Sequence, residues 1–447
     1  MNIIERIKAL FRSFFPKNEI IRITGVKPQI SADMVQALKG WRAMYDGEAS
    51  WCRDYVKSLQ IERGICREFS DVILSEMTVN ITNDNLQALY DEGVEMLNSN
   101  LQSGLALGSF VIKPLETGET EYITADNFVP LSFGLNGEPD DILFIQIRQT
   151  DDSEYYIRVE RHTLSPSGLT ITNKAYKSSD ASEFGRQVSL TAVPEWAELA
   201  EETLYPGMQA MDYGYFRTPI KNNIDGSTLG VSVYDSAIDA IRRADIQAAR
   251  LEWEYESGER AIHVDSQALK TRPDGHNGVS KLNKRLYKGL NLDDENKPLF
   301  DVYSPDFRDD SIIQGLERYY RQIEFSVGLA YGDLSNAQDV EKTATEIKNA
   351  KFRKYNRVAG LEKSLEKCLR EYIDALAFYQ DLYRTGYEVT INFKDSILTD
   401  EETERQTMRQ DLSMGILQPW EYRARWYGED EETAKAMVNQ PDKDIIE

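Results

Sequence analysis

The chain has 447 residues, of which 41% are hydrophobic and 28% charged, a composition typical of a folded protein with two or three domains. Its net charge is −23, which excludes a protein that wraps duplex DNA over its whole surface, because such binding needs Lys and Arg to neutralise phosphates. The three cysteines form no CxxC pair, so neither a disulfide framework nor a zinc ribbon is indicated. A reducing cytoplasm is the compartment that fits this cysteine usage.

The first residues, 1–16, combine a run of apolar side chains with Arg6, Lys8 and Arg12. Charges interrupt the apolar run and no small-residue cleavage site follows it, so the segment is not a signal peptide. We expect a short amphipathic helix that packs on the protein's own body, while a membrane surface or a partner remain the alternatives. No apolar run in the chain approaches the ~20 residues that a membrane span needs.

Helices are predicted at the beginning of the chain, because apolar residues recur there every three or four positions. The predicted helices cover residues 31–45, 50–77 and 85–104. From residue 109 the pattern changes to short runs rich in β-branched and aromatic residues, separated by turn sequences such as Asn136-Gly137. These runs cover residues 109–115, 121–124, 128–133, 142–149, 155–161, 169–176 and 187–191. They predict an antiparallel meander, in the form of a small barrel or a curled sheet.

Two helices joined by a compact insertion are predicted next. The first covers residues 233–256, where apolar residues follow one another at alternating intervals of three and four positions. Alanines on this apolar face imply that another helix packs closely against it. Residues 263–308 are punctuated by proline and glycine, and residues 310–330 form the second helix. We therefore predict a helical hairpin whose tip carries a small separate module.

A polar break at residues 331–339 separates this hairpin from a very long helix, predicted over residues 341–383. Gly360 lies inside the long helix and predicts a kink there. A strand at 387–394, two short helices at 400–414 and 420–427, and an acidic tail complete the chain.

The sequence contains no motif that indicates catalysis. His162, His263 and His276 do not have a metal-ligand spacing, the P-loop and GxGxxG patterns are absent, and 75 acidic residues make any carboxylate pair uninformative. A Ser-His-Asp triad stays open in principle, although residues 230–234 lack the second glycine of a nucleophile elbow. We expect no enzyme, no cofactor and no metal site.

Two basic patches stand out against the acidic background. The first lies at i, i+3, i+4 and i+7 on one face of a helix predicted in the insertion: Lys281, Lys284, Arg285 and Lys288. The second lies in the long helix: Lys348, Lys351, Arg353, Lys354 and Arg357. Each patch is a solvated helix face, a set of salt bridges between subunits, or a contact for phosphates or for a partner's acidic surface.

The order of these features resembles the portal proteins of tailed phages, especially those of siphophages and prophages of Gram-positive hosts. Four stretches support the resemblance: GLALGSFVIKP at 104–114, ITADNFVPL at 123–131, FRTPIKN at 216–222 with LGVSVYDSAI at 229–238, and GLAYG at 328–332 followed by KTATE at 342–346. Each motif is short, and their order and spacing along nearly the whole chain make the resemblance specific.

The resemblance implies an α+β portal fold. Its parts are an α/β wing that contains an antiparallel β meander, a two-helix stem, a small clip insertion, a long kinked helix and a short, mainly helical crown. The implied boundaries are wing 1–230, first stem helix 231–262, clip 263–309, second stem helix 310–331, tunnel loop 332–341, long wing helix 342–386 and crown 387–447.

The resemblance also implies a homo-oligomeric ring, usually of twelve subunits, at one vertex of the virion capsid, assembled in the host cytoplasm without a membrane. Double-stranded DNA would pass through the ring during packaging and ejection. The terminase large subunit, a head-completion or adaptor protein, and the major capsid and scaffolding proteins would be its partners. We expect a passive, flexible tunnel loop with Asp333, Ser335, Asn336 and Gln338 at the narrowest point of the channel. The alternatives are another virion component, such as a minor head or adaptor protein, and a carbohydrate-active hydrolase with paired carboxylates in a pocket.

Overall fold

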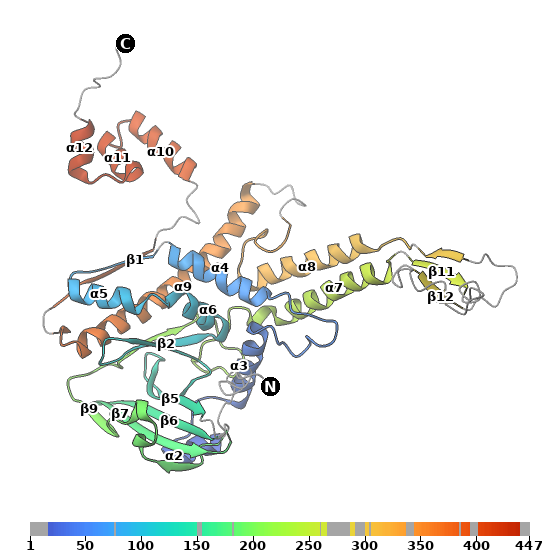
Figure 1. The fold of residues 1–447 in the computed structure, drawn as a ribbon. Coiled ribbons are helices and arrows are strands. Elements are labelled where there is room, and N and C mark those ends of the chain that lie inside the picture. The colour runs from blue at the N-terminus through green and yellow to red at the C-terminus, as the bar shows by residue number, and fades with distance from the viewer. Residues whose placement is uncertain are drawn as a thin grey trace, which may run out of the picture.

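The computed structural model describes residues 17–75, 77–149, 154–180, 183–259, 261–265, 287–290, 300–303, 305–336, 344–383, 386–393 and 401–438. Helices and mainly antiparallel sheets are combined in an α+β fold, as predicted. Figure 1 shows a body of helices and sheets from which a pair of long helices projects. Within the described ranges, no helix has both the length and the apolar character needed to cross a membrane.

Five helices dominate the first part of the described chain: α2 (Lys17–Thr24), α3 (Ala32–Tyr45), α4 (Ile61–Ser75), α5 (Asp84–Gly93) and α6 (Leu97–Leu107). The Ser31 hydroxyl accepts a hydrogen bond from the backbone of Met34, which fixes the start of α3 where the sequence predicts it. The helix predicted over residues 85–104 is wrong in its continuity, because α5 ends at Gly93 and α6 begins four residues later.

The helix predicted over residues 50–77 is wrong in its first half, because α4 begins only at Ile61. The preceding residues form a loop that is held by Asp245 of the distant helix α7 (Ile238–Ser257). The Asp245 carboxylate accepts hydrogen bonds from the Trp51 indole at 2.8 Å and from the Leu59 backbone at 2.9 Å. This tertiary contact overrides the local helical periodicity of the loop.

Strands β2 to β10 form two antiparallel sheets. The smaller sheet has the order β10-β2-β3, with β2 (Ser109–Pro114), β3 (Thr120–Thr124) and β10 (Gly214–Arg217). The larger sheet is the meander β4 (Phe128–Phe133), β5 (Pro139–Gln149), β6 (Tyr155–Ser165), β7 (Gly168–Ser178) and β8 (Arg186–Val188), and β9 (Glu202–Tyr205) also pairs with β7. Two single turns of 3-10 helix, η1 (Leu190–Ala192) and η2 (Pro194–Trp196), follow β8. The predicted meander is confirmed, although β2 and β3 belong to the other sheet.

The predicted helix–module–helix arrangement is confirmed. A 3-10 turn, η3 (Asp235–Ala237), leads into α7 (Ile238–Ser257), which lies antiparallel beside α8 (Asp309–Val327) (Figure 1). The tip of this hairpin carries a small sheet of order β12-β11-β13, made of β11 (Ala261–Asp265), β12 (Tyr287–Leu290) and β13 (Phe300–Tyr303). Lys288 lies in β12, so the helix predicted to include it is wrong at this position, where backbone pairing with β11 prevails.

Helix α9 (Ala344–Tyr379) is the long helix that the sequence predicts, and it contacts β2 and β10 of the body. Gly360, where we predicted a kink, faces Pro219, whose Cγ would lie 3.3 Å from an added Cβ. Close packing on Pro219 therefore gives a separate reason for this glycine.

The end of the described chain contains one strand and three helices. Strand β14 (Val389–Phe393) pairs antiparallel with β1 (Met77–Ile81), so the chain returns to its N-terminal part. The helices are α10 (Glu401–Ser413), α11 (Pro419–Tyr427) and α12 (Glu431–Val438). The first two were predicted, and α12 lies in the segment that we interpreted as an acidic tail. Glu431 and Glu432 occupy its first turn, where acidic side chains stabilise a helix.

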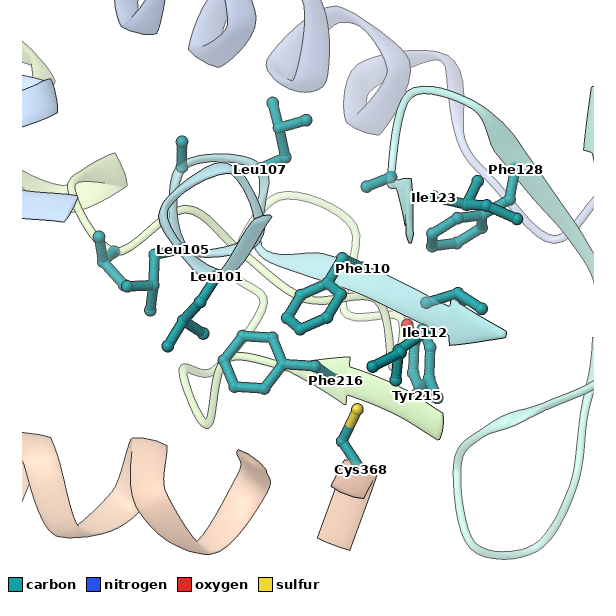
Figure 2. Packing of buried hydrophobic residues seen from close by; sticks show 14 of the residues in the cluster. Leu101, Leu105, Leu107, Phe110, Ile112, Ile123, Phe128, Tyr215, Phe216 and Cys368 are labelled. Atoms are coloured by element: carbon teal, nitrogen blue, oxygen red, sulfur yellow. The ribbon is translucent and has the colours of Figure 1, made fainter. Parts of the chain in front are cut away.

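The main core lies between the small sheet and α9. Figure 2 shows Phe110 of β2 against Phe216 of β10, with Cys368 of α9 below them, and the two phenyl centroids are 5.1 Å apart. All three residues are completely buried. Gly214 allows α9 to approach β10 closely, because an added Cβ would lie 2.1 Å from the backbone oxygen of Cys368. The long helix is therefore fixed on the sheet through direct backbone packing.

Candidate functional site

The turn that follows α8 is built around one buried carboxylate, that of Glu324. Its Oε1 accepts hydrogen bonds from the backbone N–H groups of Gly332, Leu334 and Ser335 at 3.0, 2.7 and 2.8 Å. Its Oε2 accepts the Ser335 hydroxyl at 2.9 Å. Glu324 is fully buried, so these charge-assisted bonds replace its lost hydration and fix residues 332–335 at the end of the helix.

Lys354 of α9 holds the same turn against the body. Its ammonium lies 2.6 Å from a carboxylate oxygen of Glu68 on α4 and 3.1 Å from one of Asp333 in the turn. Burial lowers the pKa of Lys354, but these two carboxylates outweigh burial and raise it overall. The ammonium therefore stays charged and joins the turn, α4 and α9.

Two arginines of α9 also contact the end of α8. The Arg353 guanidinium lies over the rings of Phe325 and Tyr331, 4.9 and 5.0 Å from their centroids. Arg357 donates from Nε to the Val327 carbonyl at 3.1 Å, and burial lowers its pKa. The carbonyl belongs to the last turn of α8, where oxygen atoms lack helical partners. These cations therefore connect the two helices of one chain.

The predicted site residues are thus partly brought together and partly separated. Asp333, Ser335 and Asn336 lie in the turn, whereas Gln338 lies outside the described residues. Of the basic patch in the long helix, Arg353, Lys354 and Arg357 engage the protein's own chain, and only the backbone is described for Lys348 and Lys351. Of the patch in the insertion, Lys281, Lys284 and Arg285 lie outside the described residues, and only the backbone of Lys288 is described.

Sequence reasoning did not identify Glu324, although a signal was present. The residue follows Ile323 directly and lies three residues before Val327, on the buried face of α8. An acidic residue at such a position is unexpected, because a buried carboxylate requires several donors. The donors come from the following turn, which the resemblance to portal proteins implied to be a flexible loop. The described residues 332–335 are instead held by four hydrogen bonds to a single side chain.

A second buried polar cluster lies between the large sheet and α9. His162 on β6 has its two ring nitrogens each 2.6 Å from a carboxylate oxygen, one of Glu160 and one of Asp212. Lys113 of β2 lies 2.7 Å from Glu160, and Tyr379 of α9 donates to Asp212 at 2.7 Å. All except Tyr379 are buried in the body, so the network connects three elements that are distant in sequence.

The protonation of His162 determines what this cluster can do. Burial lowers the pKa of His162, but the carboxylates of Asp212 and Glu160 outweigh burial and raise it to about 9. Both ring nitrogens donate to these carboxylates, so the imidazolium has no free nitrogen to accept a proton. His162 therefore does not have the geometry of a general base.

This cluster forms part of the wall of a cavity of about 920 Å³. A hydrolase acting on carbohydrate would need one carboxylic acid and one available carboxylate in such a cavity. Glu160 accepts hydrogen bonds from Lys113 and His162, and Asp212 accepts them from His162 and Tyr379. The two most buried carboxylates in the wall of this cavity therefore already have partners. Among the described residues, no group of three or more His, Cys, Asp or Glu side chains is arranged to hold a metal ion.

A family model described as phage portal protein, SPP1 Gp6-like, matches residues 144–438. The match extends over well more than half of the chain, from β5 to α12. The chain belongs to this family of phage portal proteins. No curated protein matches the chain.

The matched part of this portal protein includes most of the candidate site, whereas Glu68 and Lys113 lie before it. Glu324, the turn that it holds, and Arg353, Lys354 and Arg357 of α9 all lie between residues 144 and 438. The helical hairpin with its tip module lies there as well. The resemblance stated from the four sequence motifs is confirmed at the level of the family.

Proposed function

We propose that this portal protein forms a closed ring, of twelve subunits, at one vertex of a phage capsid. The axial channel of the ring would be the route of double-stranded DNA into and out of the head. In this proposal the protein is a structural component of the virion that assembles in the host cytoplasm and performs no chemistry of its own.

The observation that supports this proposal best is the exposed apolar surface of the projecting hairpin. Helix α7 has 20 residues, which is about 30 Å. Trp253 and Tyr255 on this helix are 65% and 45% exposed, and Phe325 on α8 is 61% exposed. Large side chains that one subunit leaves uncovered are typical of an interaction surface. A head-to-tail contact between neighbouring hairpins would cover them, and such contacts close into a ring when the rotation between subunits fits.

Within the proposed ring, each part of the chain takes the role that the resemblance to portal proteins implies. Residues 1–230 are the wing, 231–262 and 310–331 the stem helices, and 263–309 the clip at the tip of the hairpin. The long helix, 342–386, crosses the wing, and 387–447 is the crown. The clip would dock the terminase large subunit during packaging, and the head-completion or adaptor protein afterwards. The major capsid and scaffolding proteins would contact the wing.

The tunnel loop, 332–341, would face the channel from the inner end of the stem. Asp333 and Asn336 are our proposed lining residues in its described part, and Gln338 remains a prediction. Ser335 is only 7% exposed and donates its hydroxyl to Glu324, so we assign it to positioning the loop. An acidic protein with a net charge of −23 repels the phosphate backbone, which favours passage of DNA over its retention.

Light scattering on a sizing column, followed by negative-stain imaging of the same fraction, tests the ring. We expect a species of about twelve subunits that shows a central hole in end-on views. A protein that remains monomeric at high concentration and moderate salt, with and without its scaffolding protein, would contradict the proposal.

A further inference from the structure

Glu62 is a buried acid without a binding partner. It lies in the first turn of α4, its side chain is fully buried, and neither carboxyl oxygen has a hydrogen-bond partner among the described residues. An ionised carboxylate in such a place has lost its hydration without any replacement. The folded chain therefore favours the neutral acid at this position.

A second buried carboxylate, Asp245 of α7, acts electrostatically on Glu62, and its own oxygens accept several hydrogen bonds. Asp245 accepts hydrogen bonds from the Trp51 indole at 2.8 Å, the Leu59 backbone at 2.9 Å and the Cys52 thiol at 3.9 Å. All three donors belong to residues 46–60, the loop that enters α4. Asp245 therefore fastens this loop to the first helix of the projecting hairpin.

The charge of Arg63 lowers the pKa of Glu62, but it is the smallest of the causes that act on this acid. The titratable groups that act on it or on Asp245 come from every element packed there: Cys66 and Arg63 on α4, Cys52 in the loop, Tyr234 before α7 and Tyr320 on α8. Burial raises the pKa of both thiols and both phenols, so these four groups are neutral at physiological pH. Arg63 bonds instead to the Tyr45 carbonyl and the Gln60 side chain in an exposed position.

Burial raises the pKa of Glu62 to about 7 from an ordinary value of 4.5, and the charge of Asp245 acts in the same direction. Together they outweigh the residue's own backbone N–H group and Arg63, which both lower the pKa. The folded pKa lies above the unfolded value, so the closed contact binds an additional proton between these two pH values. Its stability is therefore complete below 4.5 and is lost as the pH rises through 7.

We propose that Glu62 makes the attachment of the 46–60 loop to α7 dependent on a proton, closed when the acid is neutral and loosened when it is ionised beside Asp245. The site lies within one subunit, so the proposal does not depend on the ring. It gives the hairpin a connection to the body that responds to the pH of its surroundings.

Hydrogen exchange of the full chain at pH 5 and pH 8, corrected for the intrinsic exchange rate, tests the proposal. The opening equilibrium of the loop, reported by the Leu59 amide, is expected to rise about tenfold per pH unit between the two pKa values. In Glu62→Gln the rise is expected to disappear, because the amide carries no charge at either pH. The control is Glu252→Gln, the same change at an exposed position of α7, which is expected to behave like the unmodified chain.

The pH response, and not the overall stability, is the informative quantity, since a buried amide can itself destabilise the chain. Glu62→Met provides a second neutral side chain of similar length and is expected to remove the response as well. An unmodified chain with no rise in exchange between pH 5 and pH 8 would overturn the proposal. The same rise in both Glu62 variants would also overturn it, because the titrating group would then lie elsewhere.

Discussion

The buried carboxylates of this portal protein have different surroundings, and these surroundings determine what each residue does. Glu324 accepts four hydrogen bonds and fixes a turn. Glu160 is paired with Lys113 and His162, which connects the sheets to each other. Glu62 has no partner and favours its neutral form. Because ionisation is supported at the first two sites and opposed at the third, the same kind of residue gives rigidity in two places and pH dependence in one.

Replacing Glu324 by Gln tests whether its carboxylate stabilises the turn at residues 332–335. The amide keeps one oxygen but presents an NH2 group to donors that need an acceptor, so buried N–H groups of the turn lose their partners. We expect the free energy of unfolding, measured in urea, to fall by about 3 kcal/mol. Glu317→Gln is the matched control, because Glu317 on the same helix accepts one bond, from the exposed Asn336 backbone. Its cost is expected to stay below about 1 kcal/mol, and equal losses would contradict the assigned role of Glu324.

The protonation of His162 predicts that the free energy of unfolding depends on pH in the alkaline range. Its folded pKa of about 9 lies above the ordinary 6.5, so its contribution is complete below 6.5 and is lost as the pH rises through 9. We expect the difference in unfolding free energy between the unmodified chain and His162→Gln to shrink by about 3 kcal/mol between pH 6 and pH 10. Other groups that titrate at high pH cancel in this difference. A difference that is constant with pH would show that His162 is neutral in the folded protein.

At the scale of the elements, regular structure with a local cause was predictable from the sequence. The apolar stripes of α7, α8 and α9 and the alternating runs of β4–β7 determine which face is buried, and periodicity reports this directly. The loop before α4 was not predictable, because its conformation depends on hydrogen bonds to Asp245, about 190 residues further along the chain. Strand β10 was missed as well, since only four residues pair and all of its support comes from β2 and α9.

The candidate site was likewise predictable where its cause is local, and not where it depends on contacts with residues distant in sequence. The polar composition of residues 331–339 indicated where the turn lies, and the structure places Asp333, Ser335 and Asn336 there. The sequence could not indicate its rigidity, because the acceptor is a side chain on the preceding helix. The basic patch was predictable as a group, but its partners were not. Arg353, Lys354 and Arg357 bind aromatic rings, carboxylates and a carbonyl of their own chain.

At the scale of the whole molecule, the packed body of the subunit holds the inner end of the projecting hairpin in place. Helix α9 is packed on the small sheet, its cations hold the turn, and the turn caps α8, so the inner end of the hairpin is fixed to the body. Of the large exposed side chains, Trp253 and Tyr255 lie further along the hairpin, near the end of α7. A subunit of this kind offers neighbours a firmly oriented surface, which reduces the entropy that ring closure would cost.

Trp253 is the residue at which the proposed ring is tested most directly. It is 65% exposed on α7, and a buried tryptophan at the centre of an interface often contributes 2 kcal/mol or more, which is about 30-fold in affinity. We expect Trp253→Asp to shift the assembly toward monomers in light scattering, with an unchanged thermal midpoint of the subunit, because the side chain packs little within its own chain. Leu135→Asp is the control, since this residue is fully exposed in the turn between β4 and β5. If both variants assemble like the unmodified chain, the outer face of α7 is not the contact between subunits, and the stem assignment fails even if a ring is seen.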